Sequence, residues 1–212
     1  MEKKVSLDDI RQALLLSDFD VTMAHERMSP LIRARQRPDT QNGQPRVGGV
    51  LVLLYCLNNE WHIVLTRRRE DLNSHAGQIS FPGGQQEPGE TLVMTALRET
   101  CEEVGVPETA VSILGRLSQI YIPPSDFEVH PFVGLYKNGR PHFLPDTREV
   151  AEILEVPLSQ LLSPATRREE EWEFRGMAVT IPLFDVNGNK VWGATAIMLS
   201  EFIERLRAVI AI

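Results

Sequence analysis

The stretch from Gly84 to Val106 constrains the fold most, because a glycine-containing loop leads there into a segment that strongly favours a helix. Residues 91–104 contain neither proline nor glycine, and Gly105 follows where glycine commonly ends a helix. At a period of 3.6 residues, mostly apolar side chains cover an arc of about 180° on this helix. They are Leu92, Val93, Ala96, Leu97, Thr100, Cys101 and Val104. We therefore expect one face of the helix to pack on the core.

Three carboxylates of the same segment border this apolar face. Glu99, Glu102 and Glu103 are spaced i, i+3 and i+4, so they point to one side of the helix. Like charges at this spacing repel one another, which predicts a compensating group. A hard divalent cation such as Mg²⁺ or Mn²⁺ takes oxygen ligands and keeps water molecules for chemistry. The alternative is a solvated acidic face on which Arg98 pairs with Glu102.

The loop before the helix favours the metal interpretation. Gly83 and Gly84 follow Pro82, and glycines let the backbone approach an ion or ligand closely. The carbonyl of Gly83 is therefore a candidate further ligand. Glu90 and Arg98 carry complementary charges in the same loop-and-helix unit, and we expect them to hold the loop rigid.

The rest of the chain alternates short strand patterns with helical ones, which indicates a single α/β or α+β domain. Strands are predicted at 49–57 and 61–66 around an Asn-Asn turn, and at 78–81, 111–114 and 129–136. A hairpin turn at Asn138-Gly139 predicts a returning strand at 141–144. A strand at 149–156, a short helix at 158–162, a hairpin at 179–185 and 190–192, and an amphipathic helix at 198–210 follow.

The N-terminal part differs in composition from the rest. Ser6 begins a predicted short helix, and residues 29–48 are rich in proline, glycine and arginine, which favours an irregular linker or an extended arm. We divide the chain into an N-terminal helical and extended segment, residues 1–46, and a main domain, residues 47–212. The segment is expected to serve as a helical cover or as an exchange arm. The apolar end at 209–212 is expected either in the core or at a homodimer interface.

Charge and composition exclude several classes of function. The formal net charge is −7, which argues against a nucleic-acid-binding protein, because such proteins need a basic field. The longest apolar run, residues 50–57, is far shorter than the roughly 20 residues that span a bilayer. The N-terminus has no secretory pattern, and Cys56 and Cys101 are expected to be reduced, buried thiols. We therefore expect a soluble cytoplasmic protein without a membrane partner.

The motif around the acidic helix resembles the Nudix box of the Nudix hydrolases. The matching residues are Gly84, Glu90, Arg98, Glu99, Glu102, Glu103, Gly105 and Val106, whereas Thr100 stands where an aliphatic residue is usual. The resemblance implies an α/β/α sandwich with a mixed sheet and a metal-dependent hydrolysis of nucleoside diphosphate derivatives. It implies that Glu99, Glu102 and Glu103 bind Mg²⁺ or Mn²⁺, with the Gly83 carbonyl as a further ligand. In some members the residue at the position of Glu99 is the general base instead. Arg98 and Glu90, with Gly84 and Gly105, then support the loop.

The residues before the box are similar to the signature of the coenzyme A diphosphatase branch. Leu65, Thr66, Arg68, Gly77 and residues 81–84 fit this signature, whereas Arg69 replaces a serine and Asn73 replaces an arginine. This resemblance implies coenzyme A or an acyl-CoA as the small-molecule substrate, with 3′,5′-ADP and 4′-phosphopantetheine as products. Another nucleotide-linked diphosphate, or a non-catalytic nucleotide-binding domain, is the alternative.

Three consecutive arginines lie inside this signature. Arg67, Arg68 and Arg69 form either a phosphate clamp, for which guanidinium geometry is suited, or a solvated basic loop. Their place at a strand end, just before the glycine loop, favours a substrate-binding role for Arg68.

Overall fold

The computed structural model describes residues 4–29, 43–71, 76–174 and 176–210, and its centre is a long buried strand, β1 (Arg46–Leu57). An eight-stranded sheet forms around β1, with the order β3-β2-β1-β7-β5. Of its further strands, β4 pairs with β1, β6 with β7 and β8 with β2. The sheet is mixed because β1 runs parallel to β7 and antiparallel to β2 and β4. Its other strands are β2 (Glu60–Arg68), β3 (Ile79–Ser80), β4 (Gly83–Gln85), β5 (Val111–Arg116), β6 (Ile120–Ile122), β7 (Phe127–Tyr136) and β8 (Val150–Pro157).

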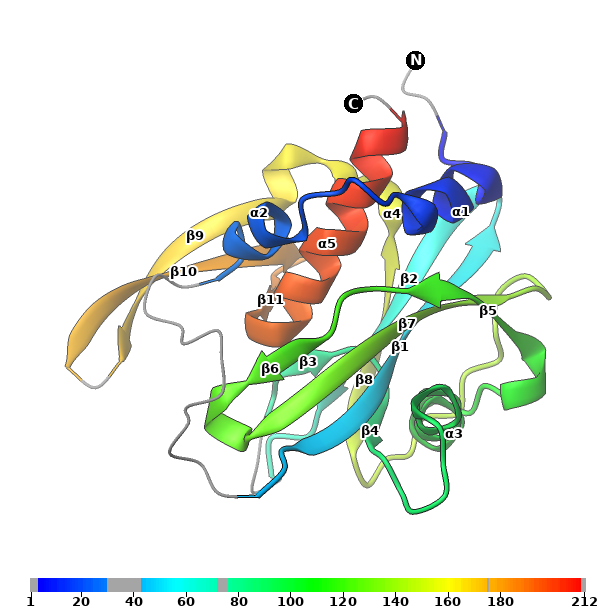
Figure 1. Cartoon of the computed structure of the whole chain (residues 1–212), viewed down its shortest axis with the longest axis horizontal. Coiled ribbons are helices and arrows are strands. Elements are labelled where there is room, and N and C mark those ends of the chain that lie inside the picture. Colours follow the sequence, from blue (N-terminus) through cyan, green and yellow to red (C-terminus); the bar gives the residue numbers. More distant parts are fainter. Residues whose placement is uncertain (1–3, 30–42, 72–75, 175, 211–212) are drawn as a thin grey trace.

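Helices cover both faces of this sheet, as the burial of β1 on both sides requires. Successive side chains of a strand point to opposite faces, and those of Leu51 and Leu53 pack in the cluster that contains Ala96 of α3 (Leu92–Val104). Those of Val52 and Leu54 pack in the other cluster, which includes side chains of α1 (Leu7–Leu15) and α5 (Gly193–Ile210). Figure 1 shows α3 on one side of the sheet and α1, α2 (Val21–Glu26) and α5 on the other. The predicted α/β/α sandwich with a mixed sheet is confirmed.

A second, three-stranded sheet packs against α5 and extends away from the main sheet (Figure 1). It consists of β9 (Arg167–Phe174), β10 (Met177–Val186) and β11 (Asn189–Trp192), and α4 (Leu158–Leu162) precedes it. The predicted hairpin of β10 and β11 is confirmed, whereas β9 was not predicted. Three short 3₁₀ helices complete the structure at Glu108–Ala110, Pro123–Ser125 and Pro164–Thr166.

The predicted hairpin that turns at residues 138–139 is wrong. Both edges of β7 are already occupied, by β1 on one side and by β5 and β6 on the other, so no returning strand can pair with it. The segment after β7 instead caps the C-terminal end of α3. The amide of Leu144 donates to the carbonyl of Val104 at 2.9 Å, and that of Asp146 donates to Glu103 at 3.0 Å. Two backbone carbonyls at this helix end are thereby satisfied.

The N-terminal helices belong to the same core as the main sheet. Ser6 begins α1 with a reciprocal pair of hydrogen bonds to Asp9, as the predicted helix start requires. Ile10 and Met28 are fully buried in the cluster around α5. Of the predicted irregular stretch at 29–48, residues 30–42 lie outside the described residues, and β1 begins at Arg46.

The C-terminal helix begins at Gly193, five residues before the predicted start at Met198. Thr195 and Ala196 in its first turn are buried, and the Thr195 hydroxyl donates to the carbonyl of Ile79 at 3.0 Å. Of the apolar end, Ile210 packs in the core, and residues 211–212 lie outside the described residues.

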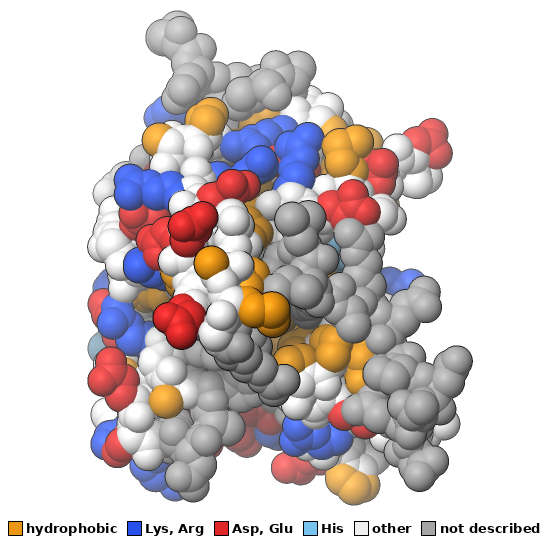
Figure 2. Space-filling view, turned by 90° about the vertical axis from the view of Figure 1, so that its left-hand side faces the viewer, with side chains coloured by type: hydrophobic (Ala, Val, Ile, Leu, Met, Phe, Trp, Pro, Cys, Tyr) orange, Lys and Arg blue, Asp and Glu red, His pale blue; other side chains and the backbone are white. Residues whose placement is uncertain are grey.

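The surface carries charges of both signs. Figure 2 shows one side of the molecule, on which acidic and basic side chains lie close together and hydrophobic side chains are scattered between them. Within the described ranges, no helix has the length and apolar character needed to cross a membrane. Cys56 and Cys101 are free thiols, and each is partly exposed rather than fully buried.

Candidate active site

The helix α3 is capped at both ends and packs closely against β1. The Thr91 hydroxyl caps its first turn, and Gly105 ends it in the left-handed conformation, with φ 76°. At Gly49 of β1, a Cβ atom would lie 2.3 Å from the carbonyl oxygen of Leu92, so only glycine allows this approach. The carboxylates of the helix therefore stand at a fixed distance from the sheet.

The strand β4 brings the glycine loop against these carboxylates. Gly83 and Gly84 pair antiparallel with β1, opposite Val50 and Gly49. The sequence predicted a close approach of this backbone to an ion or ligand, but it did not predict a strand here. At Gly84, a Cβ atom would lie 2.4 Å from one carboxylate oxygen of Glu99. Because Gly84 has no side chain, the Glu99 carboxylate packs directly against the backbone of the loop.

Glu103 is the most deeply buried carboxylate of the helix. Its exposed fraction is 8%, and its Oε2 atom is buried without a hydrogen-bond partner among the described residues. Burial and the nearby charge of Glu99 raise the pKa of Glu103 to about 8, although the charge of Arg68 and the amide of Gly83 oppose the shift. A buried carboxylate oxygen without a partner is costly, and a bound cation would satisfy it.

Glu99 lies beside Glu103 and is half-buried. Burial raises the pKa of the Glu99 carboxyl, the Arg98 guanidinium opposes this shift, and the charges of Glu102 and Glu149 add to it. Two neighbouring acids whose pKa values are both raised by burial and by nearby carboxylates indicate a functional site rather than a solvated acidic face.

Arg98 connects the helix to the loop. Its Nε donates to Oε1 of Glu90 at 2.7 Å, and its guanidinium also donates to the carbonyl of Gln85 at 3.3 Å. This pairing lowers the pKa of Glu90 to about 2. Glu90 is held further by the Thr95 hydroxyl, which donates to Oε2 at 2.8 Å. Glu90 and Arg98 thus contact each other as the sequence predicts, whereas the contribution of Thr95 was missed.

Glu102 is the most exposed of the three acids. Its side chain is 59% exposed, and one of its oxygens lies 3.2 Å from Nη1 of Arg98, the pairing expected for a solvated acidic face. Over the described ranges, no three His, Cys, Asp or Glu side chains are gathered closely enough to hold an ion as they stand. The donor set of three carboxylates, one of them on the exposed Glu102 side chain, and a backbone carbonyl suits a hard divalent cation. The residues therefore fit the ion that the sequence predicts.

The three arginines do not form one cluster. Arg67 pairs with Glu152 at 2.7 Å and donates to the amide oxygen of Asn189 in β11. Arg69 pairs with Asp71 at 2.6 Å.

Arg68 has an electrostatic effect on the acidic helix. Its charge opposes the rise of the Glu103 pKa, and its Nη1 atom lies 3.3 Å from Oε2 of Glu149. Glu149, just before β8, raises the pKa values of both Glu99 and Glu103. The pairing of Arg68 with Glu149 was not predicted from the sequence, because the two residues are 81 positions apart in the chain.

Comparisons with known proteins agree on one family. The model of the NUDIX domain matches residues 45–175. Nudix hydrolase 3 of Caenorhabditis elegans is 33% identical over 169 residues, which cover 72% of this chain and 70% of that protein. A protein of Yersinia pestis (strain Pestoides F) described as an uncharacterized Nudix hydrolase, NudL, is 34% identical over 162 residues, covering 76% and 80%.

Solved structures show the same fold at lower sequence identity. The crystal structure of a MutT/nudix family protein from Enterococcus faecalis superposes with a TM-score of 0.54 at 17% identity, covering 97% of this chain and 76% of that one. A MutT protein from Methanosarcina mazei Go1 gives a TM-score of 0.51 at 20% identity, covering 79% and 97%.

Proposed function

Because the chain belongs to the Nudix family of hydrolases, which act on pyrophosphate bonds, we propose that it hydrolyses the diphosphate bond of a nucleoside diphosphate derivative with Mg²⁺ or Mn²⁺. The leading substrate is coenzyme A or an acyl-CoA, with 3′,5′-ADP and 4′-phosphopantetheine as products. The reducing cytoplasm is the proposed location, which the two free thiols support.

The buried Oε2 atom of Glu103 carries the catalytic proposal. In the described part of the chain it has no hydrogen-bond partner, and it lies beside a second carboxylate whose pKa is raised as well. A core that excludes water would not keep two adjacent acids for stability alone, since each costs free energy when ionised. A divalent cation held by both offsets this cost.

Each residue of the site has a proposed task. Glu99, Glu102 and Glu103, with the carbonyl oxygen of Gly83, hold the cation. The bound cation neutralises phosphate charge and lowers the pKa of a bound water molecule. In the alternative role for Glu99, its carboxylate accepts the proton of the attacking water.

The surrounding residues keep these groups in position. Arg98 and Glu90 fix the loop that carries Gly83, so that its carbonyl stays near the helix. Arg68 places a guanidinium near the acids, where it can contact a phosphate oxygen of the substrate.

The preference for coenzyme A rests on the residues that fit the branch signature. Leu65 and Thr66 are buried in β2, and Phe81 is buried just before the glycine loop. These residues lie in β2, which ends at Arg68, and just before β4, which begins at Gly83.

A second candidate is another nucleotide conjugate, such as a nucleotide sugar, ADP-ribose or a dinucleotide. Two departures from the signature favour it, at Arg69 and at Asn73, and Asn73 lies outside the described residues. Arg69 is engaged by Asp71 and by the carbonyl of Thr147, and Arg67 by Glu152, so each already has partners of its own.

A substrate panel tests the proposal. Coenzyme A, acetyl-CoA, ADP-ribose, a nucleotide sugar and a dinucleotide are each incubated with the protein and Mg²⁺ or Mn²⁺, and products are separated by chromatography. We expect the highest kcat/KM for a coenzyme A substrate. A higher value for another conjugate contradicts the coenzyme A preference, and no hydrolysis of any of them contradicts the catalytic proposal. The Glu103→Gln protein, purified in parallel, controls for contaminating phosphatases.

A further inference from the structure

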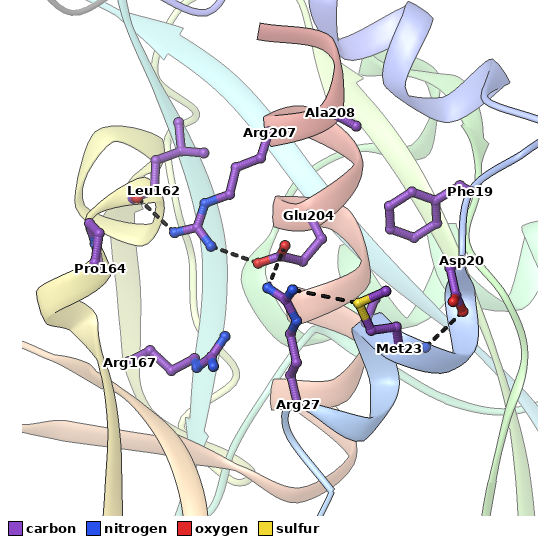
Figure 3. Close-up of a pocket in the computed structure, with 11 residues that line it drawn as sticks. Phe19, Asp20, Met23, Arg27, Leu162, Pro164, Arg167, Glu204, Arg207 and Ala208 are labelled. Atoms are coloured by element: carbon purple, nitrogen blue, oxygen red, sulfur yellow. Dashed lines mark hydrogen bonds and ion pairs between the residues drawn. The ribbon is translucent and has the colours of Figure 1, made fainter. Parts of the chain in front are cut away.

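A cavity of about 850 Å³ lies on the opposite side of the main sheet from α3. It is bordered by α2, by the chain after α4 and by the outer side of α5 (Figure 3). Its size is within the range of small-molecule sites. None of the proposed catalytic residues lines it.

Arginines from three elements converge on this cavity. Arg27 follows α2, Arg167 begins β9 and Arg207 lies on α5. In Figure 3 their guanidinium groups point toward the same space. Segments far apart in the sequence therefore place three fixed positive charges side by side.

Glu204 orients two of these arginines. Its Oε2 lies 2.9 Å from Nη1 of Arg27, and its Oε1 lies 2.6 Å from Nη1 of Arg207. Arg207 donates in addition to the carbonyl of Leu162 at 2.8 Å. A carboxylate that takes one guanidinium on each oxygen holds both groups in place before a ligand arrives, which lowers the entropic cost of binding.

The arginines are not neutralised by the acids of the cavity. Glu204 is shared by Arg27 and Arg207, and Arg167 has no ion-pair partner within the ranges that the structure describes. The carboxylate of Asp20 accepts a hydrogen bond from the amide of Met23 and so caps α2. In a chain with a net charge of −7, such a local excess of positive charge favours an anion, and guanidinium groups suit phosphate oxygens.

Apolar side chains line the cavity on both sides of the arginines. Leu162 and Pro164 lie on one side, and Phe19 and Met23, which is 50% exposed, lie on the other (Figure 3). The ring of Phe19 is held by the guanidinium of Arg205, 4.6 Å from its centre. Exposed apolar side chains beside three arginines match a ligand that carries a phosphate on an organic group.

We propose that this cavity is a second binding site, separate from the proposed catalytic one, for a small organic phosphate ester. The phosphate binds to Arg167 and to the free guanidinium donors of Arg27 and Arg207, and the organic group packs on Phe19 and Met23. Because the cavity lies across the sheet from α3 and contains cations of its own, binding there requires no divalent metal.

Calorimetric titration with phenyl phosphate and with inorganic phosphate, both in EDTA, tests this proposal. We expect phenyl phosphate to bind saturably with a Kd below about 1 mM and more tightly than inorganic phosphate. Arg167→Ala should weaken its binding at least about tenfold, since charge-assisted hydrogen bonds are lost. Arg168→Ala is the matched control, because this neighbour pairs with Asp185 at 2.9 Å and does not line the cavity.

Three results overturn the proposal. They are the absence of saturable binding, equal affinity of the Arg167→Ala and wild-type proteins, and equal affinity for phenyl and inorganic phosphate. Arg167 is exposed and makes no ion pair in the described structure, so its replacement should leave the fold intact. Unchanged thermal unfolding of Arg167→Ala confirms this, and Arg167→Glu should abolish binding at the same thermal stability.

Discussion

A methyl group at position 84 would lie 2.4 Å from Oε1 of Glu99, a distance far below van der Waals contact. Gly84→Ala should therefore displace the Glu99 carboxylate from the loop. We expect kcat/KM for the best diphosphate substrate to fall at least about tenfold, because small misplacements of a catalytic group have large effects on rate. Steady-state kinetics at saturating Mg²⁺ measures this effect.

Gly89→Ala, in the same loop, is the control. No atom lies within 4 Å of a Cβ at this position, but its φ of +89° disfavours alanine. This variant should lose about 1 kcal/mol of stability and keep its turnover. If both variants lose activity equally, the close contact with Glu99 is not the reason that position 84 is glycine.

The second prediction concerns the planar guanidinium group of Arg98, which contacts several acceptors at once. Arg98 contacts four acceptors through its three nitrogen atoms. Its Nε donates to Glu90, its Nη1 to both Glu99 and Glu102, and its Nη2 to the carbonyl of Gln85. Lysine keeps the charge but cannot reach these acceptors together, so Arg98→Lys should lower kcat at least about tenfold. A double-mutant cycle with Glu90→Gln, followed by kcat and by thermal unfolding, measures the coupling. Strictly additive losses in the cycle would show that the two residues act independently.

The pKa of Glu103 predicts a pH effect on the metal-free protein. Because the folded-state pKa, about 8, is higher than that of an unfolded glutamate, the folded protein binds more protons at intermediate pH. The stabilising contribution is complete below about pH 4.3 and is lost as the pH rises toward 8. In EDTA, urea unfolding should therefore give a falling free energy between pH 5 and pH 8.

Two comparisons isolate this effect. The decrease in the free energy of unfolding with pH should be smaller in Glu103→Gln, because glutamine carries no charge at this buried position. Saturating Mg²⁺ should raise the stability of the wild-type protein most at the upper end of the pH range. There Glu103 is ionised, and in the metal-free protein its buried charge lowers the free energy of unfolding most. The same slope in wild type and Glu103→Gln contradicts the assignment.

The stabilising contribution of Glu201 should change with pH in the opposite sense to that of Glu103. It is fully buried on α5 and accepts hydrogen bonds from His25, Arg205 and the amide of Ser118. Burial opposes its ionisation, but the bonds from His25 and Arg205 hold the pKa of Glu201 below its usual value. Its contribution is therefore present above about pH 4.3 and is lost as the pH falls further.

Glu201→Gln should lower the free energy of unfolding at pH 7 by about 3 kcal/mol, since a buried ion pair loses one partner. Glu204→Gln, three residues further on the same helix, should cost only about 1 kcal/mol because its pairs are partly exposed. Denaturant unfolding at pH 7 measures both values. Equal, small losses would show that the network around Glu201 does not hold α2 and α5 together.

The sequence predicted those elements whose residues carry a local signal. The helix that ends at Gly105, the strand that begins near Gly49 and the capped start at Ser6 are such cases, because propensity, periodicity and capping agree there. The spacing of the acids on α3 likewise predicted that Glu99 and Glu103 would stand together.

Features that depend on distant partners were not predictable. The strand β9 carries the charged run 167–171 without apolar alternation, and only pairing with β10 makes it a strand. The false hairpin at 138–139 followed a valid turn signal, but β7 has no free edge. The three arginines are adjacent in sequence, yet the structure directs Arg67 toward β11 and Arg69 toward Asp71.

Binding of Mn²⁺, followed by the loss of the free-ion electron paramagnetic resonance signal, tests the central claim most directly. The wild-type protein should bind Mn²⁺, and Glu103→Gln should bind it at least about tenfold more weakly and turn over at least about a hundredfold more slowly, with its fold intact by circular dichroism. A Glu103→Gln protein that binds Mn²⁺ and hydrolyses diphosphates as the wild type does would contradict the claim that these carboxylates hold the catalytic cation.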